Sequence, residues 1–345
     1  MSVGFLRYYN SSSPKAKLRS MFAVASMYDL DFFQFEPKDI NVEDKTINGL
    51  FWDKETHSYV RKVVPYPEIV DDQYNFRTKD KELFEELKQH CYLTFTGLGG
   101  KTAIYNRIKK SSFAKYVIET TYFRDMDELG IKNMAAGEAV IIKPNDGGRG
   151  ENIYKLQKNA DSTFTLRFEE GEKVLIFEDL KEEYFELFKT KYIVQPFIDS
   201  STIEGNPFDI RLHLRRGHEG KWDTRLNYAR IGSSSGIVSN VATGGAVAMG
   251  LNTFLKQQFG DSWRPIYNEI QQIAKTFPRV YQRNHKKLID SFAMDVAVDR
   301  SRNNELKFFE VNTYPGMQTY PFQSSEASIP FYLHLLQLKK EGKLT

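Results

Sequence analysis

The sequence lacks the features that mark several large classes of protein. Its 345 residues contain a single cysteine, Cys91, which excludes an internal disulfide, and no Cys/His cluster has the spacing of a zinc site. The first residues have no signal-type apolar core, and no stretch approaches the roughly 20 apolar residues of a membrane span. We therefore expect a soluble, cytoplasmic protein with no membrane partner.

An excess of charge of one sign is also lacking. Lysine and arginine number 48 against 45 aspartates and glutamates, a formal net charge of +3 that is too balanced to indicate a nucleic-acid surface. With 41% hydrophobic and 27% charged residues the composition is that of a globular protein, and the length predicts two or three domains. Nucleic acid is not expected among the partners.

A Walker A phosphate loop is missing by one residue. The Gly-Lys-Thr at residues 100–102 follows an apolar strand and opens a helix, but the pattern G-x-x-x-x-G-K-[ST] needs glycine where Phe95 stands. A backbone cradle for phosphates cannot close in the usual way around that side chain. The lysines that follow, Lys109, Lys110 and Lys115, form either a solvated basic face or a contact to a nucleotide.

The chain opens with a β-α-β pattern. An apolar run is followed by apolar residues at helical spacing (Leu18, Met21, Phe22 and Ala25) and then by an alternating segment. Residues 48–64 predict a hairpin, and residues 79–90 predict an amphipathic helix. We thus predict a small α/β domain over residues 1 to about 95.

Residues 291–316 predict a β-hairpin with three oxygen-bearing side chains. Asp295 interrupts an apolar run, where a lone carboxylate is costly unless something neutralises it, as a bound cation would. Glu310 and Asn312 are two residues apart and share one face of the second strand, while Phe309 faces the other way. Two carboxylates and an amide oxygen suit Mg²⁺. The alternative is a half-solvated hairpin, because acids on strand faces are common.

A second informative stretch is an apolar strand that ends at Lys143 and runs into a glycine-rich turn. Gly147, Gly148 and Gly150 let backbone N–H groups close on a ligand, and Lys143 would neutralise an anion there. The alternative is an ordinary hairpin turn with Lys143 at its rim and Arg149 exposed.

Two later strands carry further polar groups. Gln195 precedes Pro196 in a β run that is either an edge strand or a bend whose backbone groups hydrogen-bond a purine. In residues 208–215 the alternation places four polar side chains on one face: Asp209, Arg211, His213 and Arg215. That face is either solvent surface or the lining of a cleft in which guanidinium groups bind phosphate or carboxylate.

The order of these motifs resembles that of the ATP-grasp superfamily: a lysine with a glycine turn, Q-P-F, D-I-R, N before G-G, an isolated Asp, then F-E-V-N. More closely, PYPEIVDDQ, NPFDIRLHLRR and RIG…IVSN…GG resemble the YheC/YheD-type ATP-grasp proteins, which are described as endospore coat-associated. The resemblance implies an α/β (α+β) ATP-grasp fold. It implies an N-terminal pre-ATP-grasp domain over residues 1–98, a small subdomain over 99–198 and a C-terminal subdomain over 199–345.

The resemblance also implies roles for individual residues. For the nucleotide it implies that Lys143 contacts the phosphates and adenine and that Gly147, Gly148, Arg149 and Gly150 cover the triphosphate. It implies that Gln195, Phe197 and Ile198 contact the adenine. It places Asp209 near the ribose or acceptor and Lys110 at a further ATP contact. For the reaction it implies Arg211, Arg230 and Asn240 at the γ-phosphate and acyl group, with Asp295, Glu310 and Asn312 binding Mg²⁺. One departure is Ala293, because several ATP-grasp ligases carry an arginine there; Arg211 or Arg230 would replace it.

The implied activity is that of an ATP- and Mg²⁺-dependent ligase that joins a carboxylate to an amine or thiol through an acyl phosphate, releasing ADP and phosphate. Its partners would be small-molecule or peptide substrates, or a carrier protein. Two alternatives stay open: a structural spore-coat protein with a vestigial nucleotide site, and an ATP-grasp phosphotransferase. The localisation expected is cytoplasmic or spore-associated.

Overall fold

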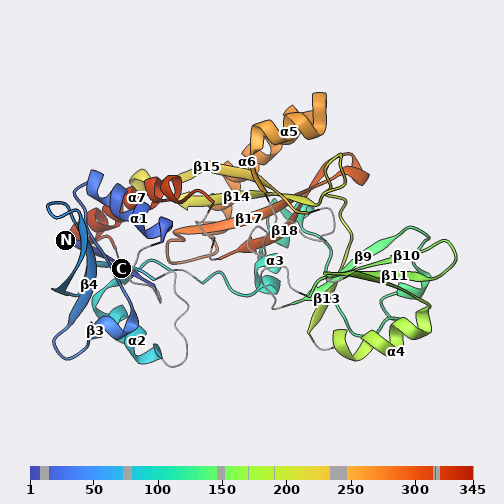
Figure 1. The fold of residues 1–345 in the computed structure, drawn as a ribbon, viewed down its shortest axis with the longest axis horizontal. Helices are drawn as coiled ribbons and strands as arrows, with labels where there is room; N and C mark the ends of the chain where they lie inside the picture. The colour runs from blue at the N-terminus through green and yellow to red at the C-terminus, as the bar shows by residue number, and fades with distance from the viewer. Residues whose placement is uncertain are drawn as a thin grey trace.

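The computed structural model describes residues 1–7, 15–72, 80–95, 97–145, 152–169, 171–189, 191–233, 247–313, 315 and 319–344. The strands form three sheets that follow one another along the chain. In Figure 1 the third sheet lies in the middle of the molecule, with the first sheet on one side (blue) and the second on the other (green). The C-terminal sheet is therefore the part of the fold that both other sheets flank.

The N-terminal sheet has the order β3-β4-β2-β1-β6-β7, with β5 paired to β4. Its strands are β1 (Ser2–Leu6), β2 (Asp31–Phe35), β3 (Ile40–Asn41), β4 (Thr46–Asp53), β5 (Ser58–Pro65), β6 (Ile69–Asp71) and β7 (Tyr92–Leu93), with helices α1 (Ala16–Met27) and α2 (Lys81–His90). β1 runs parallel to β2 and β6, while β4 and β5 form an antiparallel hairpin. The predicted β-α-β opening, hairpin and helix are confirmed.

The second sheet is antiparallel, with the order β12-β11-β10-β9-β13-β8. Its strands are β8 (Thr121–Tyr122), β9 (Ala139–Pro144), β10 (Tyr154–Lys158), β11 (Phe164–Phe168), β12 (Gly171–Leu175) and β13 (Tyr192–Pro196); α4 (Phe177–Phe188) packs on it through Leu180 and Phe188. β13 pairs with both β9 and β8, so the edge-strand interpretation of Gln195 is wrong.

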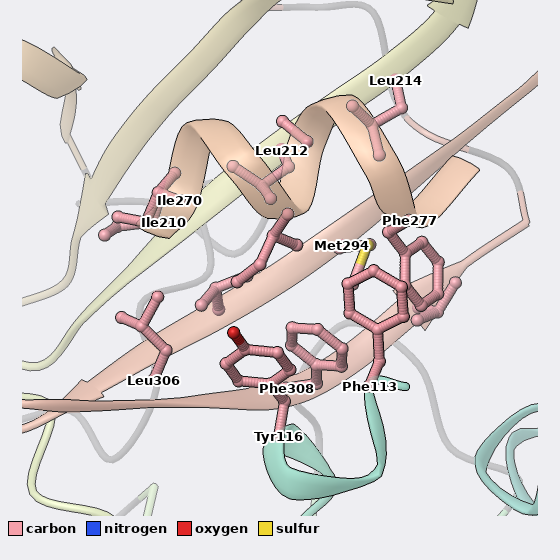
Figure 2. Packing of buried hydrophobic residues seen from close by; sticks show 14 of the residues in the cluster. Phe113, Tyr116, Ile210, Leu212, Leu214, Ile270, Phe277, Met294, Leu306 and Phe308 are labelled. Atoms are coloured by element: carbon pink, nitrogen blue, oxygen red, sulfur yellow. The ribbon is translucent and has the colours of Figure 1, made fainter. Parts of the chain in front are cut away.

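The third sheet has the order β16-β15-β14-β17-β18 and is also antiparallel. Its strands are β14 (Phe208–Arg216), β15 (Trp222–Ile231), β16 (Val247–Gly250), β17 (Ser291–Asp299) and β18 (Glu305–Asn312), with helices α5 (Leu251–Phe259) and α6 (Trp263–Gln282). Apolar residues of α6 and of alternate strand positions share one buried cluster, as Figure 2 shows for Ile270, Phe277, Ile210, Leu212 and Met294. This packing leaves the polar positions of the strands on the opposite face.

The segment that joins the first two sheets packs on the third. Helix α3 (Lys101–Lys109) contributes Ile104 and Ile108 to the same apolar cluster. The ring centroids of Phe113 and Phe277 lie 5.0 Å apart and those of Tyr116 and Phe308 lie 4.9 Å apart. Figure 2 shows these rings packed between the segment that follows α3 and the third sheet. The start of the predicted 99–198 subdomain thus shares a core with the C-terminal sheet, which places α3 beside β18.

The last helix, α7 (Pro321–Lys340), returns to the N-terminal sheet. Its Ile329, Phe331 and Leu335 are buried in a cluster with Val3 and Phe5 of β1 and with apolar residues of α1. Figure 1 shows α7 and α1 side by side, with the C-terminus close to the blue sheet. No helix in the described ranges has the length and apolar character needed to span a membrane.

Candidate active site

The face of the C-terminal sheet opposite α6 holds buried charge. β14 alternates as predicted: Ile210, Leu212 and Leu214 enter the apolar cluster, and the polar residues between them face the other way. Asp209 and Asp295 on that face are each 5% exposed. Solvent surface, one of the two interpretations of the alternation, is therefore excluded for this face.

Asp295 is held first by Arg211 on the neighbouring strand. The two residues are directly opposed in the β14–β17 register. Arg211 Nε donates to Asp295 Oδ1 at 2.7 Å and Nη2 donates to Oδ2 at 2.7 Å, a bidentate pair. The neutralising charge that the isolated carboxylate needs is thus supplied by the protein itself.

Arg230 on β15 joins a second carboxylate to the first. Its Nε and Nη2 donate to Asp209 at 2.7 and 2.6 Å, and Nη2 also lies 3.0 Å from Asp295 Oδ2. Burial alone would raise the pKa of Asp295, but Arg211 and Arg230 outweigh burial and hold that pKa at about 2. For Asp209 burial prevails over Arg230 and the pKa is raised. The four side chains form one buried network.

The second strand of the hairpin brings Glu310 and Asn312 to the same face. Glu310 is opposite Asp295 and Asn312 is opposite Ala293 in the register, and Asn312 Nδ2 donates to Asp295 Oδ2 at 3.1 Å. A register shift at Asp295 and Val296 marks a β-bulge. Because of it Phe309 packs with Ala297 on this polar side, so the prediction that Phe309 faces away from Glu310 and Asn312 is wrong.

The lysine that meets this group is Lys101, the first residue of α3. Its Nζ lies 3.2 Å from Glu310 Oε1, and the side chains are 20% and 30% exposed. Tyr105, one turn later, donates its hydroxyl to the Phe309 carbonyl at 2.7 Å and fixes α3 against β18. Lys110 lies exposed beyond the other end of the helix. The structure thus brings Lys101 to the site in place of Lys110, and the signal in the sequence was the Gly-Lys-Thr at the helix start.

Lys143 lies at the end of β9, as predicted, and close to Lys101. Burial, followed by the charge of Lys101, lowers its pKa to about 8, while Glu310 opposes the shift. Two ammonium groups thus lie near the Glu310 carboxylate, and such an arrangement suits an anionic ligand. Asn145, just after the strand, accepts a hydrogen bond from Thr102 of α3 at 3.2 Å, which ties the second sheet to α3.

The residues expected at an adenine lie on and after β13. Gln195 donates to Thr120 Oγ1 at 2.7 Å, and the Phe197 N–H donates to the Ala139 carbonyl at 3.0 Å. Ile198 is buried with Ile118 and Ala297, and Phe309 packs against them. This small apolar group lies between the second and third sheets. Gly147, Gly148, Arg149, Gly150 and Asn240 lie outside the described residues.

A family model described as YheC/D-like ATP-grasp matches residues 92–338. The chain belongs to this family.

Curated relatives and solved structures agree with that assignment. This ATP-grasp chain is 20% identical over 320 residues to the endospore coat-associated protein YheC of Bacillus subtilis (strain 168), covering 89% of the chain and 87% of YheC. It is 22% identical over 304 residues to YheD of the same organism, covering 84% of the chain but 65% of YheD. The D-cycloserine synthetase DcsG is similar with a TM-score of 0.56 at 10% identity, covering 97% of this chain and 99% of DcsG. The ATP-grasp ligase PsnB, complexed with its minimal precursor, gives a TM-score of 0.53 at 11% identity, covering 98% and 99%. The predicted α/β ATP-grasp fold is confirmed.

The residues that the ATP-grasp resemblance assigns to Mg²⁺ fit a metal that arrives with a ligand. Two carboxylates and an amide are hard oxygen donors, and because Asn312 gives its nitrogen to Asp295, its oxygen is the end left for a metal. The Asp295 oxygens, however, are engaged by Arg211 and Arg230. Among the described residues no three His, Cys, Asp or Glu side chains gather as a metal cage. Mg²⁺ commonly takes its other ligands from water and substrate phosphates, and this donor set matches that pattern.

Proposed function

We propose that the chain is an ATP- and Mg²⁺-dependent ligase that activates a carboxylate as an acyl phosphate and passes the acyl group to an amine or thiol. The observation that carries the proposal is the charge balance of the candidate site. Among the residues that the structure describes, four cations (Lys101, Lys143, Arg211 and Arg230) face three carboxylates (Asp209, Asp295 and Glu310). A site with surplus positive charge and hard oxygen donors suits a magnesium-bound triphosphate.

Binding is the first task of these side chains. Lys143 and Lys101 would contact the phosphates, and the apolar group around Ile198 would bury the base next to the backbone of Phe197. Mg²⁺, held by Asp295, Glu310 and Asn312, would offset the negative charge that the transferring phosphoryl group carries.

Charge stabilisation during transfer would come from the arginines. Arg211 and Arg230 each use Nε and Nη2 on a carboxylate, and neither Nη1 has a hydrogen bond within the described residues. The bidentate pairs fix both guanidinium planes, so those free edges are already oriented when the substrate arrives. In the reaction a substrate carboxylate oxygen attacks the γ-phosphorus and the bond to ADP breaks. The amine or thiol then attacks the acyl carbon and phosphate leaves, so no side-chain nucleophile is needed.

A single assay separates the ligase from its alternatives. The protein is incubated with ATP, Mg²⁺ and a panel of amino acids and short peptides, while ADP and free phosphate are measured and hydroxylamine is added to trap an acyl phosphate. A ligase releases ADP and phosphate in equal amounts and yields a hydroxamate. A phosphotransferase releases ADP without free phosphate. A vestigial site gives neither product and shows no thermal stabilisation by nucleotide.

A further inference from the structure

The polar face of β14 continues beyond Arg211 to two residues that the proposed reaction does not use. His213 and Arg215 are 2% and 3% exposed. Within the described residues, His213 Nε2 and Arg215 Nε and Nη1 are buried without a hydrogen-bond partner. A buried guanidinium with unmet donors destabilises a fold, so its presence calls for a partner that the described residues do not supply.

A second cation shares this corner of the molecule. Lys17 of α1 is half-buried and forms no ion pair with a described residue. Burial, and then the charges of Arg7 and Arg215, lower its pKa well below the usual range, while Asp71 opposes the shift. Lys17 and Arg215 are therefore close enough to repel each other, and both also act on His213, whose pKa is lowered mainly by burial.

The nearby carboxylates are already engaged elsewhere. Asp71 accepts from Arg7 Nη2 at 3.2 Å and from the Tyr332 hydroxyl of α7. Asp290 accepts from the Ser291 hydroxyl at 3.1 Å. Neither forms an ion pair with Arg215 or Lys17 in the described ranges. Ser324, eight residues before Tyr332 and so on the same side of α7, is fully buried and its hydroxyl also lacks a partner there.

We propose that Arg215, Lys17 and His213 bind the anionic end of the substrate, a carboxylate that lies far from the reacting group. Arg211 and Arg215 are four residues apart on one strand face, which places them roughly 13 Å apart at about 3.3 Å per residue. The substrate is then an elongated molecule, of about the length of three or four extended residues, with an anionic terminus. This inference rests on the proposed function, because Arg211 marks the reacting end.

The first test is the stability of the protein without ligand. Arg215→Met removes the unmet donors and keeps most of the side-chain volume, so its melting temperature should equal or exceed that of the wild type. A guanidinium that served only the fold would give the opposite result, a clear drop in melting temperature, and that drop would overturn the proposal. The matched control is Arg279→Met, because Arg279 is an exposed arginine of α6. This variant should have the same melting temperature as the wild type.

The second test measures the anion directly. Melting temperatures are recorded with acetate and with inorganic phosphate, at constant ionic strength, with and without saturating magnesium and the non-hydrolysable ATP analogue AMP-PNP. One or both anions should stabilise the wild type and Arg279→Met but not Arg215→Met, and the stronger one tells carboxylate from phosphate. Lys17→Met, a change at a half-buried helix position, should lose most of the same shift. Equal shifts of the melting temperature in the wild type, Arg215→Met and Lys17→Met would overturn the anion site. A wild type that responds to the anion but not to AMP-PNP would instead contradict the proposed function.

Discussion

Arg211 and Asp295 face each other across β14 and β17 and share two hydrogen bonds of 2.7 Å, with Arg230 adding a contact of 3.0 Å to the same carboxylate. An ion pair of this kind in the interior stabilises only while it is complete. Removing the carboxylate leaves two buried guanidinium groups without this partner, so the network can be tested by measuring protein stability as well as function.

Asp295→Asn should therefore destabilise the fold by about 3–5 kcal/mol in urea unfolding at neutral pH, because Arg211 and Arg230 lose their common partner. Asp223→Asn is the matched control. Asp223 pairs on β15 with Arg225, whose side chain is 70% exposed, and such a surface pair should change stability by less than about 1 kcal/mol. If the two substitutions lowered the free energy of unfolding equally, the buried ion pairs would contribute no more to stability than a surface pair.

Lys101 and Lys110 make a matched pair at opposite ends of one helix. Lys101→Met should weaken the binding of Mg-ADP by about 10- to 100-fold, the effect of losing a charged hydrogen bond. Lys110→Met should leave it unchanged, because Lys110 is exposed and outside the ion pair with Glu310. Calorimetric titration measures both, and the reverse order of effects would restore Lys110 as the nucleotide contact.

Nucleotide binding should depend on pH through Lys143. Its pKa of about 8 means that it carries its charge below that pH and loses it above, so affinity for the phosphates falls as the pH rises. Between about pH 7 and about pH 9.5 the Kd for Mg-ADP should increase roughly 10- to 30-fold. Lys143→Arg should flatten this dependence, because arginine stays charged. A wild-type Kd that is constant over this range would contradict the lowered pKa.

Stability should depend on pH through Asp72, which is buried near the end of β6. Burial raises its pKa to about 7, although the Phe95 N–H donates to it at 2.6 Å. Since its ordinary value is 3.8, the unfolded chain ionises first as the pH rises from about 4 to about 7, and stability is lost over that window. Asp72→Asn should be more stable than the wild type by about 4 kcal/mol near pH 8 and by little near pH 4. Urea unfolding at both pH values measures the difference in unfolding free energy between the variant and the wild type. If the pKa of Asp72 were not raised, this difference would be the same at both pH values.

The sequence predicted the pieces of the site better than their assembly. Alternation along the hairpin placed Glu310 and Asn312 on one face, because the period of a strand is local. The pairing of Asp295 with Arg211 depends on the register between strands that are about 80 residues apart in the chain, and no local pattern specifies that register. The bulge that turns Phe309 inward is a single-residue feature of the same pairing.

The lysine beside Glu310 could not be chosen from the sequence for a related reason. Lys101 and Lys110 both lie on or beside α3, and only the packing of the helix on β18 decides which end meets Glu310. The position of α7 could not be predicted from the sequence either, since apolar residues predict that a helix is buried but not which sheet it packs against. The resemblance and the order of motifs predicted the ATP-grasp fold, and the structure supplies its three sheets and the contacts between them.

Calorimetric titration with AMP-PNP, with and without Mg²⁺, tests the central claim most directly. The wild type should bind one nucleotide per chain in the presence of Mg²⁺. It should bind Mg²⁺ alone only weakly, because Asp295 is engaged by two arginines. The Glu310→Gln variant should bind the nucleotide at least about tenfold more weakly than the wild type. Undetectable binding by the folded wild type, or an unchanged Kd in Glu310→Gln, would contradict a magnesium-nucleotide site on this face of the sheet.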